Sequence, residues 1–134
     1  MNQDLFDRIK HDFPLTFKNK IWSGQNTGIG DGWEPILREL CSNIEDILFK
    51  NKDIEFSIFQ IKEKLSSLRF YFSCSNKNIY NQIDTLALEA ENKSGIICEH
   101  CGKYGKQCSS NYGWIKIYCN DCAKEKDFSF KEKF

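Results

Sequence analysis

The sequence predicts an α+β fold in which α-helices pack on a small antiparallel β-sheet and a cysteine-rich lobe follows at the C-terminus. Two observations predict the core. Apolar residues recur at helical spacing in two long segments, and two short strand-like runs lie between them. A third observation, two closely spaced cysteine pairs, predicts the lobe. The 134 residues are expected to form one unit, with a core over 1–94 and the lobe and tail over 95–134.

Three segments have the periodicity of amphipathic helices. Residues 4–13 place apolar side chains on one face, and Pro14 ends this helix. Residues 33–49 carry the longest apolar stripe in the chain. Residues 78–91 carry a second long stripe. All three helices are therefore expected to bury one face against the sheet or against each other.

Two segments between the long helices predict an antiparallel hairpin. Residues 54–61 are rich in Ile and Phe, and residues 68–73 alternate apolar with polar side chains, so the turn is expected within 62–67. Upstream, the glycine-rich segment 15–32 predicts a long loop that contains a short strand at 16–22. Long loops within small domains are often functional.

Four cysteines near the C-terminus have the spacing of a zinc site. Cys98, Cys101, Cys119 and Cys122 form a C-x2-C-x17-C-x2-C array. The two-residue spacer lets each pair aim both sulfurs at one point. Because four thiolates fill the tetrahedral shell of Zn²⁺, we expect one structural zinc ion in a zinc-ribbon-like lobe. Cys108 is an alternative ligand, but it lacks a CxxC partner and is expected to be a bystander.

Composition argues against several classes of protein. Lys plus Arg and Asp plus Glu both total 19, so the formal charge is zero, which disfavours a general polyanion binder. No segment approaches the roughly 20 apolar residues that cross a bilayer, and the N-terminus lacks the apolar run of a signal peptide. A cytoplasmic location is therefore expected. In a reducing compartment, the seven cysteines favour metal binding over disulfides.

The sequence lacks a recognisable catalytic constellation. Its two histidines, His11 and His100, are far apart, and no hydrolase, metalloprotease or nucleotide-binding motif occurs. The glycine-rich run 28–32 precedes a predicted helix but lacks the Lys-Ser/Thr of a phosphate-binding loop, so we interpret it as a hinge or helix entry. The chain is expected not to be an enzyme.

Several separated motifs together resemble a known family. They are Gly30-Asp31-Gly32-Trp33, Leu40-Cys41, Gln60-Ile61-Lys62-Glu63-Lys64-Leu65, Leu68-Arg69-Phe70-Tyr71, Cys98 to Gly102, Gly113-Trp114 and the second cysteine pair. Their order resembles the pattern GDGW…LC…VKEKFGGLRFY…CxxCG…GW…CxxC of a family of small, largely uncharacterised bacterial, prophage and phage proteins. Ser66-Ser67 stands where that family has Gly-Gly, which favours a wider hairpin turn here. The resemblance implies no particular activity, although its setting among mobile elements suggests toxin immunity or interference with host proteins.

The leading functional hypothesis is a non-enzymatic protein that binds another protein, such as an immunity protein or inhibitor acting on a toxin or host protein. Trp22, Trp33, Tyr112 and Trp114 are the candidate partner-binding residues, because Trp and Tyr often anchor interfaces. The alternative is a zinc-ribbon nucleic-acid-binding accessory protein of a phage or prophage. In residues 98–134, seven lysines face five acids, but a tetrathiolate zinc site would itself carry about −2 and cancel that excess. The phenylalanine-rich tail, residues 124–134, predicts either an edge strand or a mobile docking segment.

Overall fold

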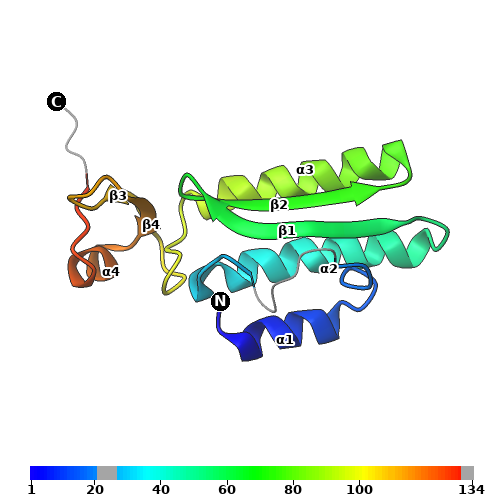
Figure 1. Cartoon of the computed structure of the whole chain (residues 1–134), viewed down its shortest axis with the longest axis horizontal. Coiled ribbons are helices and arrows are strands. Elements are labelled where there is room, and N and C mark those ends of the chain that lie inside the picture. The colour runs from blue at the N-terminus through cyan, green and yellow to red at the C-terminus, as the bar shows by residue number, and fades with distance from the viewer. Residues whose placement is uncertain (21–26, 131–134) are drawn as a thin grey trace.

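The computed structural model describes residues 1–20 and 27–130, in which four α-helices accompany two antiparallel two-stranded sheets (Figure 1). This arrangement confirms the predicted α+β class. The elements are α1 (Gln3–Asp12), the short 3-10 helix η1 (Asp31–Trp33), α2 (Glu34–Lys50), β1 (Phe56–Lys64), β2 (Ser67–Cys74), α3 (Lys77–Ser94), β3 (Lys106–Ser109), β4 (Ile115–Tyr118) and α4 (Asn120–Glu125). None of the helices in the described ranges is long and apolar enough to cross a membrane.

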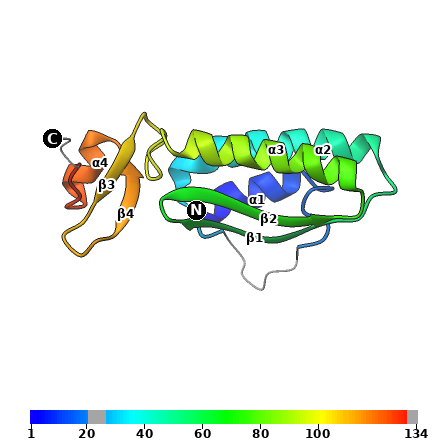
Figure 2. The same ribbon diagram turned by 90° about the horizontal axis from the view of Figure 1, so that it is seen from above.

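The β1–β2 hairpin forms one layer of the core and the pair α2 and α3 forms the other (Figures 1 and 2). Inward side chains of the hairpin are buried against the helices: Phe56, Ile58, Ile61, Leu68, Phe70 and Phe72. The register shifts between Ile58 and Gln60, and this bulge returns Ile61 to the inner face. The helix α1 lies along α2, where Phe6 and Ile9 are fully buried.

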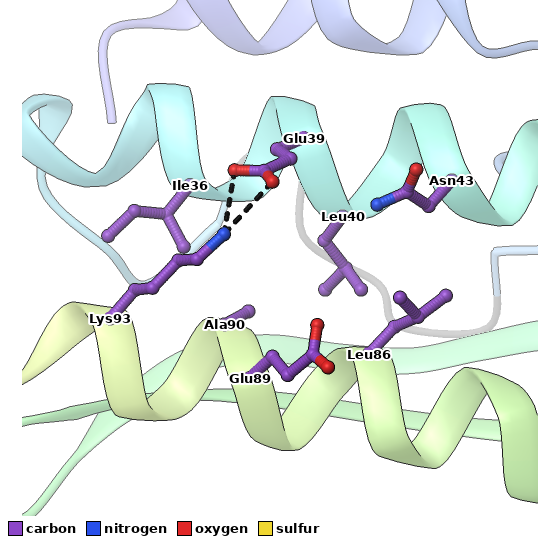
Figure 3. A pocket seen from close by; sticks show the side chains of 8 residues that line it. All are labelled: Ile36, Glu39, Leu40, Asn43, Leu86, Glu89, Ala90 and Lys93. Carbon is purple, nitrogen blue, oxygen red and sulfur yellow. Dashed lines mark hydrogen bonds and ion pairs between the residues drawn. The ribbon is translucent and has the colours of Figure 1, made fainter.

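The contact between α2 and α3 has apolar side chains in its interior and an ion pair at its surface (Figure 3). Leu40 and Ala90 are buried between the two helices. Lys93 Nζ reaches across this contact to both carboxylate oxygens of Glu39, at 2.9 Å each. An exposed pair of this kind contributes little stability, on the order of 0–1 kcal/mol, so apolar burial holds the two helices together.

The predicted strand at 16–22 does not form within the described residues. Residues 14–17 make turns, and only Lys20 makes an isolated parallel bridge, to Ile58 of β1; residues 21 and 22 lie outside the described residues. Further on, Gly28 makes a second parallel bridge to β1, at Lys62. The described residues of the loop therefore pair with the edge of β1 through single bridges at these two points.

The prediction of a wider hairpin turn is wrong. Lys64 pairs directly with Ser67, so Leu65 and Ser66 alone make the turn. Both residues have positive φ, +52° and +63°. A two-residue turn with both central residues left-handed matches the right-handed twist of the strands, and it normally contains Asn and Gly. The Glu63 carboxylate accepts the Ser66 N–H at 3.3 Å and so supports the turn without glycine.

Relieving this backbone strain should stabilise the protein. Left-handed non-glycine residues cost about 1–3 kcal/mol each. We expect Leu65→Asn combined with Ser66→Gly to raise the free energy of unfolding by about 1 kcal/mol, measured by urea denaturation. Leu65→Ala is the matched control, because it removes the same exposed side chain and keeps a strained φ. Equal stability of the two variants would show that the turn is unstrained.

Candidate metal centre

Four cysteine sulfurs converge at one point of the C-terminal lobe. Cys98, Cys101, Cys119 and Cys122 place their sulfur atoms within 4.8 Å of one another, close enough to hold a metal ion. This convergence confirms the predicted grouping of the two CxxC pairs. Cys101 is exposed and the other three are buried, so the cluster lies at the surface with most of its sulfur enclosed by protein.

Each pair is positioned by its own local structure. In the first, the Gly102 N–H donates to the Cys98 carbonyl at 2.9 Å, and Gly102 has φ +83°, a conformation that glycine adopts without steric cost. In the second, β4 delivers Cys119 to the N-cap of α4. There the Cys122 N–H donates to Cys119 Sγ at 3.4 Å. A tight turn and a helix start therefore direct two sulfurs each toward a common centre.

The thiols of the cluster differ in acidity. The hydrogen bond from the Cys122 backbone N–H lowers the pKa of Cys119 to about 7. Burial raises the pKa values of Cys101 and Cys122. Metal ligands must be thiolates, so a bound cation would have to displace protons from these thiols. Of these three thiols, Cys119 loses its proton most easily.

The other cysteines lie outside the cluster. Cys108 is buried in β3, and its thiol donates to the Lys116 carbonyl at 3.4 Å. Cys41 is fully buried on α2, where burial raises its pKa. Cys74 lies at the end of β2, with its thiol 3.6 Å from the Asn76 carbonyl. None of these three sulfurs is among the four that converge.

The first cysteine turn docks against the glycine-rich loop that precedes α2. The Gly32 N–H donates to the Glu99 carbonyl at 2.7 Å, and the Gly30 N–H donates to the Glu99 carboxylate at 3.1 Å. The chains approach so closely that a Cβ on Gly32 would lie 2.0 Å from the Cys98 carbonyl oxygen. The glycines therefore form the entry to η1 and α2, as one of our interpretations held, and they also admit the backbone of the cysteine turn.

Charge and apolar contacts reinforce this junction. Lys116 Nζ contacts Glu63 Oε1 of β1 at 2.7 Å and Glu99 Oε1 at 3.3 Å. Burial lowers the pKa of Lys116, but the two carboxylates outweigh it and raise the pKa overall. Ile117 belongs to the main hydrophobic core even though it lies in β4. The lobe and the core consequently share side chains and are not independent bodies.

The four candidate partner-binding aromatics do not share one environment. Trp33 is fully buried, and its indole N–H donates to the Ile97 carbonyl at 2.8 Å, so its assignment to a binding surface is wrong. Trp22 lies outside the described residues. Tyr112 and Trp114 are 90% and 69% exposed. Trp33 is buried because the glycine-rich loop before it packs against the cysteine turn.

Sequence reasoning did not single out the exposed side chain of Tyr104 or the buried charge of Glu99. Tyr104 is 76% exposed just after the first cysteine turn, and its position among polar residues could have indicated this. Glu99 is only 6% exposed, and no sequence signal indicates that a charged residue between two cysteines is buried.

Compared with known proteins, the chain matches no family model, no curated protein and no solved structure.

The glycine contact predicts a large position-specific loss of stability. Gly32→Ala should lower the free energy of unfolding by about 3 kcal/mol, because its Cβ would overlap a backbone oxygen that cannot move independently. Gly113→Ala is the control: it strains a left-handed residue (φ +85°), which Gly32→Ala does not, but its Cβ meets nothing within 4 Å, so only about 1 kcal/mol is expected. Urea denaturation measures both. Similar losses would contradict the close approach.

Proposed function

We propose that the four-cysteine cluster binds one structural Zn²⁺ in a zinc-ribbon-like lobe. A zinc–sulfur bond of about 2.3 Å separates neighbouring sulfurs of a tetrahedron by about 3.8 Å. Cys101 Sγ and Cys119 Sγ lie 3.6 Å apart, which fits that geometry. An all-sulfur donor set favours zinc among the abundant divalent ions, because calcium and magnesium prefer oxygen. When bound, the ion would link the first cysteine turn to the start of α4.

We further propose that the protein is non-enzymatic and binds another protein through the tip of the β3–β4 hairpin. The exposure of Tyr112 and Trp114 carries this proposal, because large aromatic side chains in such positions have little packing role in the free protein. The Trp114 N–H donates to Ser110 Oγ at 3.1 Å, which helps to fix the backbone beneath the indole. The resemblance supports a toxin or host protein as the partner, with inhibition as the outcome.

The nucleic-acid alternative is weaker because several lysines of the lobe have internal contacts. Lys116 is held by Glu63 and Glu99, and Lys106 Nζ lies 4.7 Å from the ring centre of Phe130. Phe128 packs edge-on against Tyr118, and Ser129 bridges to Ser109, so the described start of the tail forms part of the lobe. The carboxylates of Glu63 and Glu99 neutralise Lys116, which lowers the positive charge that the lobe can offer to phosphates, and phosphate contacts supply most nucleic-acid affinity.

Metal content tests the first proposal. Protein purified without added metal should contain about one equivalent of zinc by elemental analysis. Cys119→Ser should lose the ion and unfold the lobe, because structural zinc sites contribute on the order of 10 kcal/mol of binding free energy. Amide hydrogen exchange at Ile117 and Tyr118 would report that unfolding, while circular dichroism should show α2 and α3 still folded.

Cys108→Ser is the matched control for the zinc experiment. Its hydroxyl can still donate to the Lys116 carbonyl, so the variant should keep one zinc ion and nearly all its stability. Loss of zinc from this variant would show that Cys108 is a zinc ligand. A Cys119→Ser variant with unchanged melting behaviour would show that the site is not structural.

A stoichiometric complex tests the second proposal. The full chain should recover one protein partner from the source cell, and if that partner is a toxin its activity should fall as the complex forms. Trp114→Ala should weaken the complex by roughly 2 kcal/mol, as expected for an interface anchor, without changing stability. Phe49→Ala is the control, because Phe49 is similarly exposed, at 63%, but lies at the far end of α2.

The contrary outcome for the second proposal is equally specific. Recovery of nucleic acid whose affinity falls steeply with salt, with no protein partner, would favour the alternative function. Equal binding by Trp114→Ala and Phe49→Ala would exclude the hairpin tip as the contact surface.

A further inference from the structure

The outer edge of β2 has backbone groups without a partner. In an antiparallel pair, every second residue directs its N–H and C=O away from the other strand. The Leu68 N–H donates to Ser94 Oγ at 3.0 Å, away from β1, so Phe70 and Phe72 direct their backbone groups outward too. Over residues 1–20 and 27–130, no other segment donates to or accepts from these outward groups.

The opposite edge of the hairpin is covered by the chain itself. The Ile58 N–H of β1 donates to the Asn19 carbonyl at 3.0 Å. The Gly28 N–H donates to Ile61 O at 3.0 Å, and its carbonyl accepts from the Glu63 N–H at 3.3 Å. Extended backbone therefore pairs with the edge of β1, whereas beyond Leu68 the described chain leaves the edge of β2 open.

A groove runs beside this open edge, between β2 and α3. Figure 1 shows α3 lying outside β2, as α2 lies outside β1. A helix is about 10 Å across, whereas strands are spaced about 4.8 Å apart, so two helices extend past a two-stranded sheet and leave room for another strand. The groove measures about 280 Å³, and its lining includes Tyr71, Tyr80 and Leu88, which are 39%, 38% and 52% exposed.

The edge also lacks the usual protection against strand pairing. Natural edge strands carry proline, lysine or inward-pointing charge that prevents association. The sequence of β2, SLRFYFSC, has a single charged residue, Arg69, and Glu91 of α3 neutralises it at 3.3 Å. An unprotected edge beside exposed aromatic side chains is the arrangement that binds extended peptides by strand addition.

We propose that the edge of β2 binds an extended segment of another protein as a third strand. Apolar side chains at alternate positions of that segment would contact Tyr80 and Leu88, and a basic side chain would face Asp84. Asp84 is half-buried in the groove, and its carboxylate has no hydrogen bond or ion pair with any described residue. This surface is separate from the hairpin tip at Tyr112 and Trp114, so the inference goes beyond the proposed function.

A single strand fits this edge better than a second copy of the chain. Two β2 edges paired with each other would lie about 4.8 Å apart. Each copy would also bring an α3 that extends past its own edge, and packed helices need about 8–10 Å between axes. The helices would collide before the strands could pair. A peptide strand brings no helix of its own.

Peptide selection tests the proposal without knowledge of the natural partner. The probe is a displayed library of random linear peptides of about ten residues, selected on the full chain. Enriched peptides should alternate β-branched or aromatic residues with polar ones, include Lys or Arg, and lack internal proline. N-methylation of every second peptide residue should abolish binding, and N-methylation of the intervening residues should not. Binding should slow amide exchange at Phe70 and Phe72 but not at Tyr71, whose N–H faces β1.

A pair of leucine variants locates the site on the protein. Leu88→Arg should weaken peptide binding at least about tenfold, because it removes an apolar contact and places a cation against the apolar side chains of the incoming strand. Leu65→Arg makes the same exchange at a leucine that is also exposed, at 69%, but lies in the hairpin turn, and it should bind normally. Circular dichroism verifies that both variants fold.

Three results would overturn the inference. One is failure to enrich any peptide. Another is enrichment of peptides that Trp114→Ala rejects and Leu88→Arg accepts, which would support the hairpin-tip proposal and remove this one. The third is a concentration-dependent dimer that Leu88→Arg dissociates, which would make a second copy the occupant of the groove.

Discussion

The architecture depends on one backbone-to-backbone contact, between the cysteine turn at residues 98–102 and the glycine-rich loop at 30–33. A side chain on Gly32 would prevent it, because a Cβ there would lie 2.0 Å from the Cys98 carbonyl oxygen. The contact directs the Trp33 indole toward Ile97 and the Glu99 carboxylate toward Gly30. Two motifs that are far apart in the sequence, GDGW and CxxCG, therefore form the two halves of one interface.

The small lobe relies on this contact because its own apolar core is minimal. Its buried cluster consists of Tyr118, Ala123 and four cysteines, Cys98, Cys108, Cys119 and Cys122, and three of these cysteines belong to the candidate metal site. Segments below about 40 residues seldom bury enough apolar surface to fold alone and commonly use a metal or disulfides. Docking through Glu99 and Ile117 adds contacts with the larger core. If the cluster binds the proposed zinc ion, its loss should consequently disturb the lobe first and the helical layer last.

The sequence predicted the local features of the structure better than the long-range ones. Helical and strand periodicity identified the long helices and the hairpin, and CxxC spacing identified the sulfur cluster, because each pattern is set by neighbours in the chain. Trp33 and Glu99 were misjudged or missed, because their burial depends on partners more than 60 residues away. The turn at Leu65 and Ser66 was also misjudged, because strand pairing there overrides an unfavourable local conformation.

The two proposed binding surfaces, the tip of the β3–β4 hairpin and the open edge of β2, can act independently because the two strands of the β1–β2 hairpin make different contacts. The backbone edge of β1 is hydrogen-bonded to Gly28, and the Glu63 carboxylate of β1 is paired with Lys116 of the lobe. The strand β1 therefore takes part in the junction with the lobe. On β2 the bond from Leu68 to Ser94 closes the end of the edge nearest the lobe, and only the part beyond it stays open. A strand added there would extend along α3 and away from the metal centre. It would leave Trp114 exposed, so one chain could contact a partner at both surfaces and gain affinity from the linkage.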